Sequence, residues 1–122
     1  WLGVKMLNSE KNIFENHISQ WEIYDLPHNI SVENSLQTIL NYLKNNKQNL
    51  ISASTQIIIA PGYKFRLIDR MFTNFHQPQS TLLLLVGAFT GNDWRKIYDY
   101  ALENDFRFLS YGDSNLLFKN QI

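Results

Sequence analysis

The clearest apolar pattern in the chain is that of an amphipathic helix. After Ser31, apolar side chains recur at spacings of three and four residues: Val32, Leu36, Ile39, Leu40 and Leu43. This spacing predicts a helix over residues 32–45 with one apolar stripe. The Ser31 hydroxyl can accept a hydrogen bond from a free N–H of the first turn. The polar run 45–49 ends the helix, because Asn tolerates the left-handed C-cap conformation.

Period-two patterns and apolar runs predict strands on either side of this helix. Residues 8–16 are polar and are predicted as a loop, and residues 18–26 alternate in polarity and are predicted as a strand. Residues 55–60 are rich in β-branched and apolar side chains, which is typical of a buried strand. Pro61-Gly62 predicts a tight turn. Residues 63–69 alternate again and are predicted to form a hairpin with the strand before them.

The C-terminal third predicts two helices. Ser80 can cap a helix over residues 81–89, which are almost wholly apolar. Asp93 can cap a second helix over residues 94–104. Its predicted inner face holds Trp94, Ile97, Tyr98, Ala101 and Leu102.

A short strand over residues 106–109 and a polar turn over residues 110–113 complete the pattern. The order is strand, helix, hairpin, helix, helix, strand. It predicts an α/β fold, with α+β as the alternative, built as a mixed sheet with flanking helices. No repeat, low-complexity segment or linker divides the chain, so residues 1–122 are expected to form a single unit.

Composition narrows the classes of function. The 122 residues carry zero formal net charge and no cysteine. Zero charge argues against a stand-alone nucleic-acid binder, which needs an excess of Lys and Arg. The absence of cysteine excludes disulfides, thiolate metal sites and a cysteine nucleophile. The longest apolar run, residues 82–89, is far shorter than the roughly 20 residues of a membrane helix.

A polar group inside an apolar stretch is the first candidate site. Thr73, Asn74 and His76 lie between phenylalanines and the leucine run that begins at Leu82. Polar groups in such surroundings must find partners or face a cavity. His76 suits proton transfer near neutral pH. The alternative is a satisfied polar turn that leads into a helix.

The turn after the last predicted strand is the second candidate site. Loops at the carboxyl ends of strands are favoured ligand sites in α/β proteins. Here Ser110 and Tyr111 precede Gly112, which would let a ligand approach the backbone, and Asp113, which could hold ribose hydroxyls or an amine. The alternative is an ordinary turn in which Asp113 caps its own backbone.

The predicted hairpin supplies a third candidate. Lys64 and Arg66 would share one face of a strand, with Tyr63 and Phe65 on the other. Such a strip could contact phosphates beside an aromatic surface, or it could be a solvated hairpin face. No metal-ligand spacing, phosphate loop or nucleophile elbow accompanies these groups.

Three segments together resemble one known family. They are residues 59–65 (Ile-Ala-Pro-Gly-Tyr-Lys-Phe), residues 73–86 (Thr-Asn-Phe-His-Gln-Pro-Gln-Ser-Thr-Leu-Leu-Leu-Leu-Val) and residues 106–113 (Phe-Arg-Phe-Leu-Ser-Tyr-Gly-Asp). Their order and spacing are similar to the C-terminal end of the S-adenosylmethionine:tRNA ribosyltransferase-isomerases of queuosine synthesis. Gln77 departs from the leucine more usual in that family. The family's Gly-Thr-Thr-Ser signature and β-barrel insertion are not present in this sequence.

This resemblance implies a fold and a reaction. The chain would be the C-terminal part of the larger α/β domain of a two-domain, cytoplasmic enzyme. That enzyme transfers the ribosyl part of S-adenosylmethionine to the 7-aminomethyl-7-deazaguanine base at the tRNA wobble position. The product is epoxyqueuosine, and adenine and methionine are released. S-adenosylmethionine is a substrate, and neither a cofactor, a metal nor a membrane is expected.

The resemblance also implies roles for the candidate residues. His76 and Asp113 are the expected catalytic residues, His76 for acid–base work and Asp113 for contact with ribose or with the substrate ammonium. The expected substrate-binding residues are Tyr63, Lys64, Thr73, Asn74, Ser80, Ser110, Tyr111 and Gly112. Two alternatives remain open at this point: a non-catalytic module that binds RNA or a nucleotide, and a structural segment that supplies no catalytic group.

Overall fold

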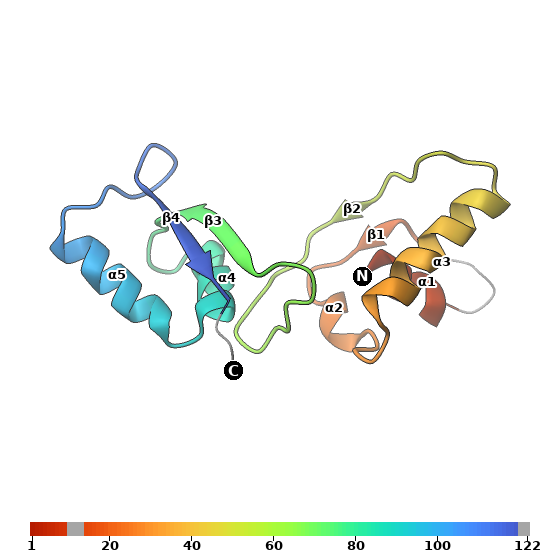
Figure 1. The fold of residues 1–122 in the computed structure, drawn as a ribbon, viewed down its shortest axis with the longest axis horizontal. Coiled ribbons are helices and arrows are strands. Elements are labelled where there is room, and N and C mark those ends of the chain that lie inside the picture. The colour runs from red at the N-terminus through yellow and green to blue at the C-terminus, as the bar shows by residue number, and fades with distance from the viewer. Residues whose placement is uncertain (10–13, 120–122) are drawn as a thin grey trace. The chain divides into compact units, whose positions relative to one another are not determined.

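The computed structural model describes residues 1–9 and 14–119, so residues 10–13 of the predicted 8–16 loop lie outside the described part. The chain forms two compact units, Trp1–Ile58 and Ile59–Ile122. The sequence gives no linker signal at this boundary. Both units mix helices and strands, as expected for an α/β chain (Figure 1). The described strands form two separate two-stranded sheets and not one mixed sheet.

The N-terminal unit contains the best-predicted helix. Helix α3 (Val32–Asn45) has the expected bounds, and the Ser31 hydroxyl accepts a hydrogen bond from the Asn34 amide at 3.1 Å. Its C-cap differs from the prediction. Asn46 has a φ of −92°, and the left-handed conformation is adopted by Lys47, with a φ of 53°.

Helix α3 packs on α1 (Leu2–Asn8), and its buried residue is not one that the apolar pattern predicted (Figure 1). Ser35 is buried, whereas Leu36 and Leu40 are 58% and 43% exposed. The reason is a close approach at Gly3. A Cβ on this glycine would lie 2.1 Å from the Ser35 carbonyl oxygen, so only small groups fit where the helices meet.

The predicted strand over residues 18–26 is wrong beyond its first residue. Strand β1 (His17–Ile18) pairs in parallel with β2 (Ser54–Thr55), and the chain then forms the short helix α2 (Glu22–Asp25). Of the predicted strand over 55–60, only Thr55 lies in a strand of the structure. Its pairing with the first strand nevertheless continues, because the amides of Gln56 and Ile58 donate to the carbonyls of Ile18 and Gln20.

The C-terminal unit is built on an antiparallel pair that the sequence did not predict. Strand β3 (Arg70–Asn74) pairs with β4 (Ser114–Phe118), so that Thr73 lies opposite Asn115. The strands predicted over 63–69 and 106–109 are wrong. In 106–109, the backbone amides bond to the end of a helix, to a side chain and to Phe75, and not to a neighbouring strand.

Two helices follow the first strand of this sheet. Helix α4 (Thr81–Thr90) begins where predicted, with the Ser80 hydroxyl accepting from the Leu82 amide at 3.2 Å. It ends at Gly91, whose φ is 60°. Helix α5 (Asp93–Glu103) has Asn92 and not Asp93 as its N-cap, and Asp93 instead pairs with Lys96.

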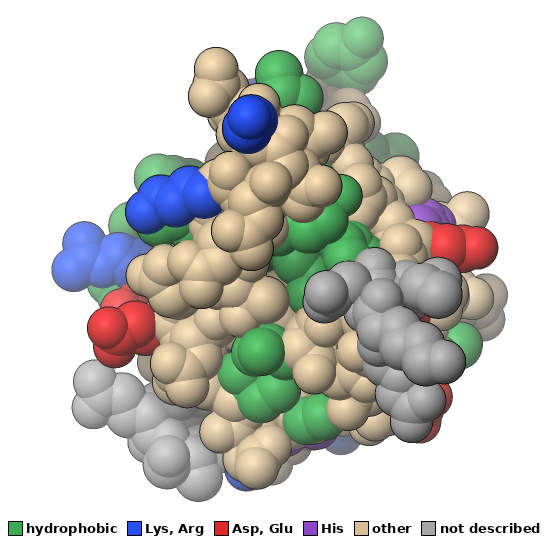
Figure 2. Space-filling view, turned by 90° about the vertical axis from the view of Figure 1, so that its right-hand side faces the viewer, with side chains coloured by type: hydrophobic (Ala, Val, Ile, Leu, Met, Phe, Trp, Pro, Cys, Tyr) green, Lys and Arg blue, Asp and Glu red, His purple; other side chains and the backbone are tan. Residues whose placement is uncertain are grey.

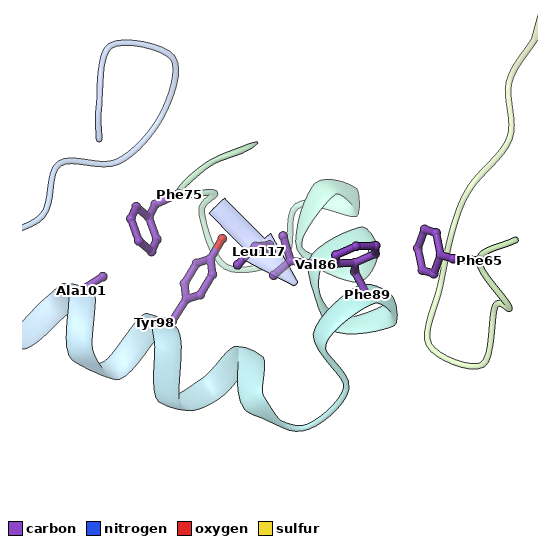
Figure 3. Packing of buried hydrophobic residues seen from close by; sticks show 7 residues of the cluster. All are labelled: Phe65, Phe75, Val86, Phe89, Tyr98, Ala101 and Leu117. Atoms are coloured by element: carbon purple, nitrogen blue, oxygen red, sulfur yellow. The ribbon is translucent and has the colours of Figure 1, made fainter. Parts of the chain in front are cut away.

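The helices and the sheet enclose an aromatic core (Figure 3). Phe89 and Val86 of α4 are almost fully buried, and the Phe89 ring meets Phe65 edge-on at 4.9 Å. Tyr98 of α5 meets Phe75 in the same way at 5.4 Å. Because edge-to-face aromatic pairs stabilise beyond their buried area, this core fixes the segment that follows β3.

Apolar side chains also reach the surface. Figure 2 looks onto the N-terminal unit and shows hydrophobic side chains between polar ones. In the C-terminal unit the outer face of the sheet exposes Phe72, Leu116 and Phe118. None of the described helices combines the length and apolar character needed to cross a bilayer.

Candidate functional site

A hollow of about 260 Å³ lies where β3 ends and α4 begins. Its walls come from three segments: the end of the strand, the loop into the helix, and the turn before β4. The lining residues are Asn74, His76, Gln77, Ser80, Leu82, Leu109 and Ser110. The structure therefore brings four predicted site residues together, from positions 74 to 110 of the chain.

His76 is held in this hollow from two sides. Its backbone amide donates to the Tyr98 hydroxyl oxygen at 2.9 Å, and its Nε2 lies 2.6 Å from Thr73 Oγ1. Partial burial lowers the pKa of His76 below its ordinary value, because the charged imidazolium loses hydration there. Burial therefore favours the neutral form of the ring, which can accept a proton.

Asn74 fastens one wall of the hollow to another. Its Nδ2 donates to the Leu109 carbonyl at 2.9 Å, and its Oδ1 accepts from the Ser114 hydroxyl at 2.9 Å. The Leu109 amide also donates to the Phe75 carbonyl at 2.8 Å. These bonds tie the turn that carries Ser110 to the end of β3. The side-chain amide of Asn74 is thus hydrogen-bonded within the protein through its oxygen and through one of its two N–H groups.

Asp113 does not line the hollow. Its carboxylate accepts from the Arg107 amide at 2.7 Å and from the Arg107 guanidinium at 3.2 Å. These two hydrogen bonds hold the pKa of Asp113 below its ordinary value. A carboxylate engaged in this way closes its own turn, which corresponds to the structural alternative considered for this segment.

The neighbouring turn residues Gly112 and Tyr111 also lie outside the hollow. Gly112 makes room for the protein's own backbone: a Cβ there would lie 2.4 Å from the Arg107 carbonyl oxygen. Tyr111 is 97% exposed and lies outside the hollow. Of this predicted group, only Ser110 faces the site.

Tyr63 and Lys64 line a second hollow, of about 550 Å³, which shares no lining residue with the first. One wall is the 61–65 turn, where Gly62 has a φ of 100°, and the other is the last part of α4. The Tyr63 ring packs edge-on against Phe65 at 4.9 Å. This hollow is mostly apolar, and Lys64 and Lys119 are its cationic residues.

Sequence reasoning missed three residues that line the hollow and one residue, Tyr98, that holds the His76 backbone. Gln77 and Leu82 belong to the polar block and leucine run that predicted the site, and Leu109 directly precedes Ser110. Tyr98 was predicted only as a core residue, because nothing local indicates its bond to His76. Across the described ranges, no group of three or more His, Cys, Asp or Glu side chains could hold a metal ion.

Comparison with known proteins places this arrangement in a family. A family model described as "Queuosine biosynthesis protein" matches residues 28–117, which include every residue of the His76 hollow. The chain belongs to this queuosine biosynthesis family. The match begins inside the N-terminal unit and ends in β4, so it spans both units.

Two curated relatives of this chain carry the same enzyme name. The S-adenosylmethionine:tRNA ribosyltransferase-isomerase of Chlorobaculum parvum is 37% identical over 122 aligned residues, which cover 83% of this chain and 36% of the relative. The enzyme of the same name from Paraburkholderia phymatum is 54% identical over 71 residues, covering 57% of this chain and 20% of the relative. The chain thus spans about a fifth to a third of the length of these relatives.

A solved structure agrees with these relatives. The crystal structure of S-adenosylmethionine tRNA ribosyltransferase from Thermotoga maritima matches with a TM-score of 0.50 and 36% sequence identity. The match covers 66% of this chain and 30% of that one. The mixed α/β architecture is therefore shared with a family member of known structure.

Proposed function

We propose that this chain forms the C-terminal part of a cytoplasmic S-adenosylmethionine:tRNA ribosyltransferase-isomerase. The enzyme would transfer the ribosyl part of S-adenosylmethionine to 7-aminomethyl-7-deazaguanine at the tRNA wobble position, giving epoxyqueuosine, adenine and methionine. Family membership and the names of the relatives support this proposal. The cytoplasm follows from tRNA being the proposed substrate.

The observation that carries the proposal is the position of His76 in a hollow lined by hydroxyl and amide groups, where partial burial lowers the pKa of its ring. The reaction needs a group that takes a proton from an amine or from a carbon next to the sulfonium. It also needs a group that returns a proton to the departing adenine. A histidine with a lowered pKa can do the first as a neutral base and the second as the imidazolium so formed.

The other lining residues suit the ribose and its neighbours. Ser80 and Ser110 present hydroxyl groups, which can donate to and accept from ribose hydroxyls. Gln77 adds an amide, and Leu82 and Leu109 offer apolar contact to a base or to the methionine chain. We therefore assign Asn74 to holding the site together and the two serines to the ligand.

The second hollow suits RNA. Tyr63 offers an aromatic surface and Lys64 a cation next to it, a combination that binds a base together with its phosphate. The zero net charge of the chain means that most phosphate contacts must come from outside it. We assign Tyr63 and Lys64 to contacts with the tRNA and not to the chemical step.

The test uses a hybrid enzyme in which this chain replaces the matching part of the Chlorobaculum parvum relative. Ribosyl transfer from S-adenosylmethionine to modified tRNA is measured for His76→Gln. We expect kcat to fall by about 100-fold or more, because general acid–base catalysis contributes at least that much. His28→Gln is the matched control, since His28 is exposed and outside the hollow, and should retain full turnover.

The pH profile provides a second measurement. Because burial lowers the pKa of His76, kcat/KM should rise with pH along a limb centred below the ordinary value of 6.5. The limb should be absent in His76→Gln. Full turnover by His76→Gln would remove this residue from the mechanism. A hybrid that neither transfers ribose nor releases adenine would contradict the proposed function itself.

A further inference from the structure

The hydroxyl of Thr73 has one hydrogen and two neighbours that could accept it. Its Oγ1 lies 2.6 Å from His76 Nε2 and 3.3 Å from the Asn74 carbonyl oxygen. The carbonyl can only accept a hydrogen bond, whereas Nε2 can donate or accept, depending on the tautomer of the ring. The arrangement of these three groups therefore determines where the imidazole proton lies.

Only one arrangement makes both contacts hydrogen bonds. In it, His76 Nε2–H donates to Thr73 Oγ1, and the Thr73 hydroxyl donates to the Asn74 carbonyl. If the hydroxyl donated to Nε2 instead, the two oxygens of Thr73 and Asn74 would face each other without a hydrogen between them. An unsatisfied partly buried polar contact of this kind costs free energy, so the first arrangement is favoured.

We propose that Thr73 is a positioning residue that fixes His76 in the Nε2–H tautomer and leaves Nδ1 as the proton acceptor of the hollow. This inference rests on the proposed function, in which His76 is the base. In the part of the chain that the structure describes, no hydrogen bond occupies Nδ1. Thr73 was expected from the sequence to bind the ligand, and its contact with the ring assigns it to His76 instead.

Two further contacts keep the ring in place. The His76 amide donates a hydrogen bond to the hydroxyl oxygen of Tyr98, which is itself a titratable residue. Burial raises the pKa of Tyr98, so that hydroxyl stays neutral over the working range of pH. Thr73 itself is fixed by the β3–β4 pairing, opposite Asn115. The hydrogen-bond partner of the His76 amide thus lies on α5, and the partner of its ring lies on β3.

The proton transfer that this geometry supports is balanced. A hydrogen on a substrate nitrogen or carbon leaves as a proton, and the electrons of the broken bond stay on that substrate atom. The proton binds Nδ1 through its lone pair and gives an imidazolium. The Nε2–H bond to Thr73 then becomes a charge-assisted hydrogen bond, so Thr73 stabilises the charged form that appears during the step.

The tautomer can be measured on the chain itself, without turnover. Nitrogen-15 NMR of histidine-labelled protein, at a pH above the His76 pKa, separates a protonated Nε2 from a protonated Nδ1. The His76 signals are assigned by comparison with His76→Gln. We expect a protonated Nε2 in the wild-type chain. A wild-type ring protonated at Nδ1 would overturn the proposal, whatever the variants do.

Two substitutions test the role of the hydroxyl. Thr73→Val keeps the shape and removes the hydroxyl, and Thr73→Ser keeps the hydroxyl. For Thr73→Val we expect a mixture of tautomers, with kcat of the hybrid enzyme lowered by about 10- to 100-fold, as for other groups that orient a functional histidine. KM should stay unchanged, since the residue does not touch the substrate. Thr73→Ser should restore both the tautomer and kcat.

The outcomes separate this inference from the proposed function. A Thr73→Val chain that keeps the wild-type tautomer and pH profile overturns the positioning role. A shifted tautomer with unchanged kcat supports the positioning role but contradicts His76 as the base. If Thr73→Val does not fold, the wild-type tautomer and the Thr73→Ser variant decide the question.

Discussion

Gly112 offers a sharp test of the view that the 109–114 turn is a structural wall of the site. A Cβ added at this position would lie 2.4 Å from the Arg107 carbonyl oxygen and 2.6 Å from the Phe108 carbonyl group. These are backbone atoms and cannot rotate away. Gly112→Ala must therefore open the turn, and its two closing bonds, to Leu109 at 2.9 Å and from Asp113 to Arg107 at 2.8 Å, would lengthen.

The size of the effect follows from these contacts. Forcing an extra carbon into a tight contact typically costs about 1–3 kcal/mol. Each lost hydrogen bond contributes about 1 kcal/mol, so opening the turn costs a similar amount. We expect Gly112→Ala to lose about 2 kcal/mol, which for a unit of this size lowers Tm by roughly 8–16 °C. Ser110 and Leu109 would leave the His76 hollow at the same time.

The measurement is urea unfolding followed by circular dichroism, with Gly87→Ala as the matched control. A Cβ at Gly87 would meet the side chains of Trp94 and Pro61 at ordinary contact distances of 3.5 and 3.8 Å. Because Gly87 lies inside α4, alanine should stabilise the chain by up to about 1 kcal/mol. A wild-type midpoint for Gly112→Ala, or a larger loss for Gly87→Ala than for Gly112→Ala, would refute the reasoning.

Two predictions concern the N-terminal unit. Gly3→Ala places a Cβ 2.1 Å from the Ser35 carbonyl, so α1 should separate from α3 and its amides should lose protection from hydrogen exchange. The Glu22 carboxylate bonds to Lys5 Nζ at 2.7 Å, and although burial alone would raise its pKa, the bonds from Lys5 and Ser19 lower it below 4.5. This pairing stabilises the fold above that pH and is lost as the pH falls through the lowered pKa. Glu22→Gln should therefore flatten the acid side of a plot of unfolding midpoint against pH, and an unchanged slope would exclude the pair as its cause.

Helices α3, α4 and α5 were predictable because their signals are local. The Ser31 hydroxyl marks the start of α3 and the polar run 45–49 marks its end, and Ser80 marks the start of α4. The burial of Ser35 in α3 was not predictable. It depends on Gly3, which lies far from Ser35 in the sequence and admits α1 only at that point.

The strands were largely not predictable because their pairing is non-local. The alternation in 63–69 is as regular as that of a strand, yet strand β3 forms from 70–74 instead, where β4 is its partner. The polar block was identified as a candidate site from residue types, and the structure does gather Asn74, His76 and Ser80 around one hollow. Residue types could not show which polar groups are already hydrogen-bonded within the protein.

Within the segment 73–76 each side chain has a separate task. Thr73 meets the His76 ring, Asn74 fastens the neighbouring turn, and Phe75 is 3% exposed in the core. Tyr98 joins these tasks, because its ring packs on Phe75 while its hydroxyl accepts from the His76 amide. His76 is therefore held by an aromatic side chain that also packs in the core. Any change that loosens this packing should move the imidazole before it unfolds the unit.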